Sequence, residues 1–172
     1  MTEQQEEGLI VSSMPYVTIY SDGSYKPQLG TGGYGSIAVC GNETRFFYGG
    51  YYDVSNNAME LMAALMAIRS LATHCRILII SDSKYLVNGI NSWVSGWHAN
   101  GWTKADGRPV QNKELWEEMW MHMQQHLIKA IWKRGHQDSN FDNTVCDQFA
   151  CIGAYKEAKM NIPSHLLDIR RS

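Results

Sequence analysis

The chain has 172 residues, of which 44% are hydrophobic and 19% are charged. This is the size and composition of one globular domain. Its formal net charge of −2 excludes a uniformly basic nucleic-acid binder, so any contact with nucleic acid must come from local patches. No stretch approaches the roughly 18 apolar residues of a membrane span, and residues 1–7 are acidic and polar, unlike the start of a signal peptide. We therefore expect a soluble, non-secreted protein.

The cysteine pattern points to a reducing compartment. The cysteines form no C-x-x-C pair, and each lies within an apolar or periodic segment: Cys40, Cys75, Cys146 and Cys151. We expect four buried free thiols rather than two disulfides, and hence a cytoplasmic protein.

The first part of the chain predicts an antiparallel meander. Residues 1–14 lack periodicity and predict a flexible N-terminal arm. Residues 16–20 alternate as a strand does and end at the turn signal S-D-G-S of residues 21–24. Two more strands are expected over residues 34–40 and 45–52, and the short connections favour antiparallel pairing.

The rest of the chain predicts helices that alternate with strands. Apolar residues at three- and four-residue steps mark a helix of about four turns that opens after Asn56-Asn57. Residues 77–80 form a continuous aliphatic run, as expected for a central strand covered on both faces. The remaining segments are a helix from Ser83 to about Trp93, an excursion over residues 96–109, a helix over 112–126, a strand over 127–132, a polar loop over 135–143 and a helix over 144–159.

This order of elements predicts an α/β domain with a five-stranded mixed sheet, in which an antiparallel meander is joined by parallel strands and flanked by helices. We place the domain at residues 15–159 and a C-terminal tail at residues 160–172. We find no internal repeat and no linker that would divide it.

Four acidic residues stand at the ends or starts of the predicted elements: Asp22, Glu60, Asp82 and Asp147. Each has a local structural explanation. Asp22 precedes Gly23 in a common turn pair, and Asp82 can cap the helix that follows it. Glu60 and Asp147 each lie three residues after a capping residue, which is the offset of a capping box.

Taken together, the four acids favour a shared site. In an open α/β sheet, the ends of neighbouring strands and the starts of the following helices meet in one crevice. Carboxylates gathered there repel each other and raise each other's pKa values unless a cation lies among them. All-oxygen ligation selects Mg²⁺ or Mn²⁺. We therefore expect two divalent ions, about 3.5–4 Å apart, that position a phosphodiester for in-line attack.

The strings that contain these acids resemble ribonuclease H type 1 in order and spacing. They are Tyr20-Ser21-Asp22-Gly23-Ser24, Asn56-Asn57-Ala58-Met59-Glu60-Leu61, Ser81-Asp82-Ser83-Lys84-Tyr85, Trp132-Lys133-Arg134-Gly135-His136 and Cys146-Asp147-Gln148-Phe149-Ala150. The resemblance covers about residues 15–158, and residues 101–116 look like that family's substrate-gripping protrusion. It implies a ribonuclease H-like fold and a monomeric endonuclease that cuts the RNA strand of RNA–DNA hybrids. The products would carry 5′-phosphate and 3′-hydroxyl ends, and each site would use two Mg²⁺ ions, for which Mn²⁺ can substitute.

The resemblance also implies roles for single residues. The four acids would be the metal ligands, and His136 would match the family's mobile histidine, which helps protons or product to leave. Histidine suits that role because it titrates near neutrality without perturbation. Substrate contacts in the minor groove of the hybrid are implied for Gly23, Ser24, Ser55, Asn56, Asn57, Trp93 and the loop residue Asn143. Helix capping is the alternative for Ser55 and Asn56, and a place in the core is the alternative for Trp93.

Two other functions stay open. A DNA nuclease or strand-transfer enzyme of the broader superfamily would keep the fold and the metals. A catalytically silent hybrid-binding module would have lost an acid, whereas this chain keeps all four.

Two further features bear on binding. In the protrusion, Asp106 lies among only three cations, Lys104, Arg108 and Lys113, so we expect moderate hybrid affinity that is sensitive to salt. His122 and His126 have the spacing of a zinc pair but no third ligand, and we expect them on the surface of an amphipathic helix.

Overall fold

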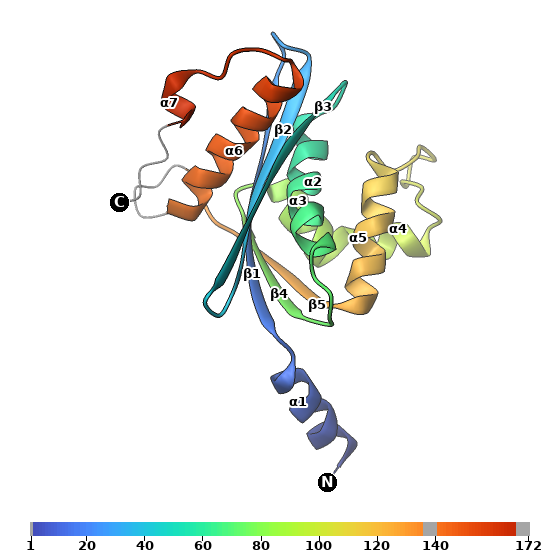
Figure 1. Ribbon diagram of the computed structural model, residues 1–172. Coiled ribbons are helices and arrows are strands. Elements are labelled where there is room, and N and C mark those ends of the chain that lie inside the picture. The colour runs from blue at the N-terminus through green and yellow to red at the C-terminus, as the bar shows by residue number, and fades with distance from the viewer. Residues whose placement is uncertain (1, 136–140, 168–172) are drawn as a thin grey trace.

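The computed structural model of the protein describes residues 2–135 and 141–167 (Figure 1). At its centre is a five-stranded sheet in the order β3-β2-β1-β4-β5. The strands are β1 (Tyr16–Lys26), β2 (Thr31–Cys40), β3 (Glu43–Tyr52), β4 (Arg76–Ser81) and β5 (Leu127–Trp132). β1, β2 and β3 pair antiparallel, whereas β4 lies parallel to both β1 and β5. The predicted mixed sheet is confirmed.

Helices cover both faces of this sheet (Figure 1). One face carries α2 (Asn56–Arg69), with α5 (Lys113–Gln125) packed beside it. The other face carries α6 (Phe141–Glu157), which lies over β1, β2 and β3. A continuous helical stretch joins β4 to the protrusion; it consists of α3 (Lys84–Asn88), the π-helical η1 (Gly89–Trp93) and α4 (Val94–Ala99). A short helix, α7 (Ser164–Leu167), follows α6.

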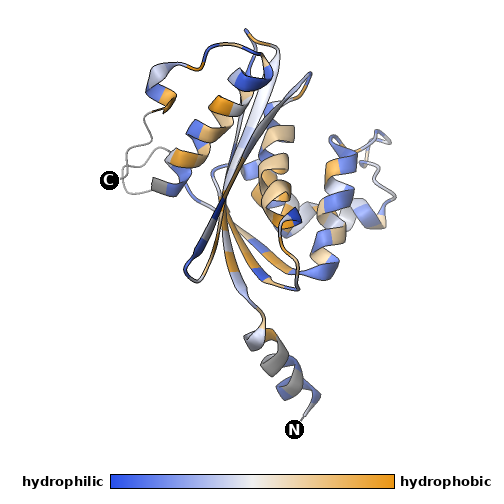
Figure 2. Cartoon of the chain, in the orientation of Figure 1, coloured by the Kyte–Doolittle hydropathy of each residue, from blue (hydrophilic) through white to orange (hydrophobic). Residues whose placement is uncertain are grey.

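The main core lies between the sheet and α2. Figure 2 shows α2 as an apolar helix, and its buried residues include Leu61, Leu65 and Ile68. They pack against Ile19 of β1 and Ile79 of β4 in one cluster. Burial of these side chains is the main favourable contribution to folding.

β2, not β4, is the strand buried on both faces. Residues 31–38 of β2 are all buried, because α2 lies on one side and α6 on the other. In β4 the burial alternates, and Leu78 and Ile80 are only half-buried on the face opposite α2. The aliphatic run of residues 77–80 is a strand inside the sheet, as predicted, but the prediction that both of its faces are covered is wrong.

Glycines in β2 let α6 lie directly on the sheet. A Cβ atom at Gly33 would lie 1.8 Å from the carbonyl oxygen of Ala150, and one at Gly35 would lie 2.2 Å from that of Cys146. The backbone of α6 therefore rests on the backbone of β2. This contact fixes the position of Asp147, which is the next residue of α6 after Cys146.

The N-terminal segment, for which the sequence predicted a flexible arm and no helix, is helical. α1 (Glu3–Ser13) projects beyond the end of the sheet (Figure 1). The Thr2 backbone N–H donates to the Gln5 side chain at 2.8 Å, as in a capping box. The helix has no apolar stripe, which is why periodicity failed to predict it.

Several predicted boundaries differ from the structure. β1 continues through Asp22-Gly23, so this pair is not a turn. The helix after Ser83 continues past Trp93 to Ala99. α6 begins at Phe141, so Asn143 lies in the first turn of a helix rather than in the predicted polar loop.

All four cysteines are free, as predicted, although Cys40 is only half-buried. No helix in residues 2–135 and 141–167 is long and apolar enough to cross a membrane. His126 is buried, not exposed as predicted, and its Nδ1 accepts a hydrogen bond from the Cys75 backbone N–H at 3.1 Å. His122 is largely buried as well and contacts Glu118 on the same helix.

Candidate metal centre and active site

Strand register brings Asp22 and Asp82 together. The parallel pairing of β1 with β4 ends at Tyr20 and Ile80, and β4 itself ends at Ser81. Each aspartate lies two residues beyond this last pair, so the two carboxylates stand at the same level. β1 continues past the end of β4, because β2 still pairs with it there.

Glu60 reaches the same place from α2. Ser55 caps this helix, since its Oγ accepts a hydrogen bond from the Ala58 backbone N–H at 3.1 Å. Glu60 therefore lies in the second turn of the helix. A Cβ atom at Gly23 would lie 2.4 Å from the Glu60 backbone nitrogen. Only glycine lets α2 approach β1 this closely, and the approach brings Glu60 beside Asp22.

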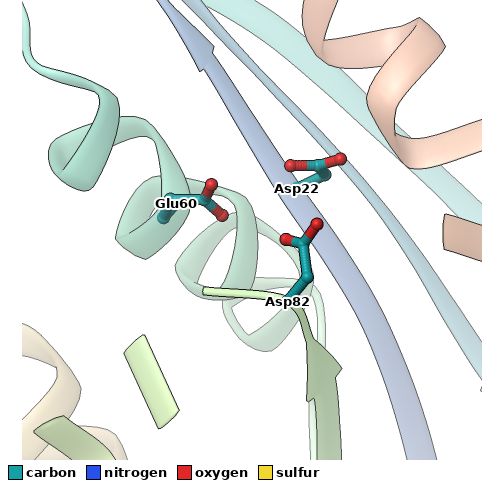
Figure 3. A group of neighbouring side chains, drawn as sticks. All are labelled: Asp22, Glu60 and Asp82. Atoms are coloured by element: carbon teal, nitrogen blue, oxygen red, sulfur yellow. The ribbon is translucent and has the colours of Figure 1, made fainter. Parts of the chain in front are cut away.

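The three carboxylates converge (Figure 3). One ligand oxygen from each of Asp22, Glu60 and Asp82 lies within 4.8 Å of the others. Asp22 and Glu60 are buried, with 6% and 5% exposure, and Asp82 is half-buried.

This arrangement is electrostatically unfavourable without a cation. Burial, followed by the charges of Asp82 and Asp147, raises the pKa of Asp22 to about 8. Burial, followed by the charges of Asp22 and Asp82, raises the pKa of Glu60 to about 9. Oε2 of Glu60 is buried and has no hydrogen-bond partner among the described residues. A buried acceptor without a donor, in a group of anions, fits a hard divalent cation with oxygen ligands.

Asp147 lies near Asp22 but outside the cluster of Asp22, Glu60 and Asp82. It is half-buried on α6, and its charge contributes to the raised pKa of Asp22. It does not belong to the set of carboxylates within 4.8 Å of one another. The structure thus brings three predicted ligands together and leaves the fourth at the edge of the cluster.

Helix capping accounts for neither Asp82 nor Asp147. Ser83, not Asp82, caps α3, since its Oγ accepts a hydrogen bond from the Leu86 backbone N–H at 3.2 Å. Because α6 begins at Phe141, Asp147 lies beyond the position of a capping box. The capping explanations for both residues are therefore wrong.

Comparison with known proteins identifies the family. The family model described as RNase H matches residues 14–155. The chain belongs to the RNase H family. It is 38% identical over 146 residues to a ribonuclease H of Bradyrhizobium diazoefficiens, a match that covers 85% of this chain and 94% of that protein. It is 43% identical over 123 residues to a ribonuclease H of Cupriavidus metallidurans, covering 72% of this chain and 85% of that protein.

Solved structures show the same fold. The chain aligns with LC9-RNase H1, a type 1 RNase H with the type 2 active-site motif, at a TM-score of 0.73 and 26% identity. This alignment covers 84% of this chain and 74% of that one. The PFV RNase H domain aligns at a TM-score of 0.69 and 19% identity, covering 84% and 98%, which supports the fold alone. The predicted enzyme class, a ribonuclease H, is confirmed.

Around the RNase H carboxylates, the start of α2 presents polar side chains. Asn56 is exposed, and its Nδ2 donates a hydrogen bond to Glu60 Oε1 at 3.4 Å. Asn57 is half-buried, and Ser55 is engaged as the helix cap. Ser24 differs from these residues, because its hydroxyl is buried against Cys151 Sγ at 3.6 Å. Its side chain is therefore buried, unlike that of Asn56.

The remaining predicted RNase H substrate residues lie in different settings. Trp93 is 39% exposed and packs edge-on against Tyr85, so the core alternative for it is wrong. Asn143 is 3% exposed and lies beside Gly135 near Asp82. His136 lies outside the described residues.

Sequence analysis missed two residues that contact Asp82. The Trp132 indole N–H donates to the Asp82 backbone oxygen at 2.8 Å, and Gly135 lies against the Asp82 carboxylate. Both belong to the fourth of the strings that resemble RNase H. Their position at the end of a strand parallel to β4 and just beyond it was the available signal.

Proposed function

We propose that the protein is an endonuclease that hydrolyses the RNA strand of RNA–DNA hybrids with divalent metal ions. Membership of the RNase H family supports the substrate class. The single observation that carries the mechanism is the convergence of Asp22, Glu60 and Asp82, with an unpartnered buried oxygen on Glu60. The products would carry 5′-phosphate and 3′-hydroxyl ends.

Two Mg²⁺ ions, or Mn²⁺ in their place, would be held by Asp22, Glu60, Asp82 and Asp147. When bound, the ions supply Lewis-acid stabilisation of the charge that develops on the scissile phosphate. The chain's own part is to hold the carboxylates in place and to keep them ionised once the cations are present. His136 is proposed to help protons or product to leave the site.

The hybrid would lie across the start of α2 and the exposed face of η1. The proposed substrate contacts are Gly23, Ser24, Ser55, Asn56, Asn57, Trp93 and Asn143. Exposed Asn56 and Trp93 support this path, because an RNA–DNA hybrid is recognised through polar and aromatic contacts to sugars and phosphates across its minor groove. We further propose a monomer that acts in the cytoplasm, with residues 15–159 as its catalytic domain.

Cleavage of labelled duplexes tests this function. With Mg²⁺ or Mn²⁺ the protein should cut an RNA–DNA hybrid and spare RNA–RNA and DNA–DNA duplexes. Asp22→Asn and Asp82→Asn should abolish cleavage while hybrid binding persists. Cleavage of DNA duplexes would support the strand-transfer alternative, and binding without cleavage in either metal would support the silent module.

A further inference from the structure

The last residue of β5 and the residue after it hold the backbone around Asp82. The Lys133 backbone N–H donates to the Ser81 backbone oxygen at 2.9 Å, which extends the pairing of β5 with the end of β4. One residue earlier, the Trp132 indole N–H donates to the Asp82 backbone oxygen at 2.8 Å. Trp132 and Lys133, at the end of β5, therefore hold the end of β4, where Asp82 leaves the sheet.

The Trp132 ring is itself held in place. Trp132 is 46% exposed, but one face of its ring is covered, because the Lys84 ammonium lies 5.2 Å from the ring centroid. A cation over an aromatic face is attracted by the ring quadrupole. Lys84 lies two residues after Asp82, so one indole contacts both Asp82 and the start of the helix that follows it.

The carboxylate of Asp82 is confined from the same segment. A Cβ atom at Gly135 would lie 2.2 Å from Asp82 Oδ2 and 3.2 Å from its Cγ. Any side chain at position 135 would therefore push the carboxylate away from its present place. That place lies within 4.8 Å of the ligand oxygens of Asp22 and Glu60.

We infer that Trp132 and Gly135 are positioning residues that set the Mg²⁺ affinity of the carboxylate cluster through Asp82. Trp132 fixes the backbone of Asp82, and Gly135 leaves the space that its carboxylate occupies. Groups that orient metal ligands in this way change metal affinity by about 10- to 100-fold when they are removed. The inference rests on the proposed function for the identity of the metal, but it concerns binding of the metal to the protein alone.

Two variants and two matched controls test the inference. Trp132→Phe keeps an aromatic face for Lys84 but removes the indole donor, together with part of the ring. Its control is Trp116→Phe, which removes an indole hydrogen bond to Tyr85 of 2.7 Å in the buried core. Gly135→Ala adds one Cβ beside Asp82. Its control is Gly96→Ala, since a Cβ at Gly96 meets nothing within 4 Å.

Mg²⁺ is titrated into each full-length protein, without substrate, and followed by calorimetry and by NMR of the backbone amides around residues 22, 60 and 82. The unfolding temperature and the KM for the hybrid are measured for the same proteins. We expect Mg²⁺ affinity to fall about tenfold in Trp132→Phe and more in Gly135→Ala, with hybrid KM little changed. Trp116→Phe should lower the unfolding temperature and leave Mg²⁺ affinity unchanged, and Gly96→Ala should change neither.

Unchanged Mg²⁺ affinity in both variants would overturn the inference, and a raised hybrid KM at unchanged Mg²⁺ affinity would assign Trp132 to substrate binding instead. A wild-type protein that binds no Mg²⁺ would overturn it together with the metal centre. A wild-type protein that binds Mg²⁺ but fails to cut hybrids would refute the proposed function alone, because the effect of the variants on Mg²⁺ binding would still be measured.

Discussion

At the scale of single residues, the carboxyl groups of Asp22 and Glu60 make the metal-free protein sensitive to pH. Their pKa values rise from 3.8 and 4.5 to about 8 and about 9 on folding, mainly through burial. At a pH between the unfolded and the folded pKa of each group, the carboxyl is protonated in the folded state and ionised in the unfolded state. Stability therefore falls as pH rises through this window.

We predict that the metal-free protein has a lower unfolding temperature at about pH 9 than at about pH 6. Mg²⁺ should raise the unfolding temperature more at the higher pH, because it binds the ionised carboxylates of the folded state. Calorimetric scans with chelator and with Mg²⁺ measure both effects. Asp22→Asn serves as the control, since an amide cannot ionise and its pH dependence should be flatter. A metal-free stability that rises with pH over this range would contradict the pKa shifts.

The sequence indicated which acids share a site better than it indicated how far apart they lie. Their spacing and strings indicated one shared site, and three of them do converge. That Asp147 lies at the edge of the cluster depends on where α6 rests on β2, and no local pattern encodes that distance. The roles of Trp132 and Gly135 were also hidden, because both act through the position of another residue.

At the scale of secondary-structure elements, α6 depends on the glycines of β2. We predict that Gly35→Ala lowers the free energy of unfolding by about 1–3 kcal/mol, because the new Cβ would push α6 away from the sheet. The same shift should move Asp147 and weaken Mg²⁺ binding. Urea unfolding and Mg²⁺ titration measure these effects.

Gly8→Ala is the control for this prediction, because a Cβ at Gly8 in α1 meets nothing within 4 Å. It should leave Mg²⁺ binding unchanged and should not destabilise the protein. If Gly35→Ala matched the wild type in both measurements, α6 would not rest on β2 as closely as the structure has it.

Element types were predictable from hydrophobic periodicity, whereas several boundaries were not. Asp22-Gly23 has the composition of a turn, but β2 pairs with β1 past this point and keeps it extended. Gly23 is needed there for the approach of α2, not for a turn. In α1 the capping residues were a readable signal that the absence of periodicity concealed.

At the scale of the whole molecule, a net charge of −2 leaves hybrid binding to local cations. The protrusion after α4 carries Lys104 and Arg108, and Lys113 begins α5, but Arg108 and Lys113 are paired within the protein. Arg108 Nε donates to Asp106 at 2.8 Å, and Lys113 lies 3.7 Å from Glu117. The protrusion therefore offers a phosphate less positive charge than its sequence suggests.

We predict that Asp106→Asn strengthens hybrid binding about two- to threefold at low salt and steepens its salt dependence, because Arg108 becomes free to contact a phosphate. Fluorescence anisotropy over a salt series, with Ca²⁺ in place of Mg²⁺ to prevent cleavage, measures the affinity. Glu43→Gln removes one negative charge from a pair with Arg45 at the start of β3, away from the protrusion (Figure 1). If net charge alone mattered, Asp106→Asn and Glu43→Gln would raise hybrid affinity equally, which would contradict the prediction. If the protrusion acts locally, only Asp106→Asn raises hybrid affinity.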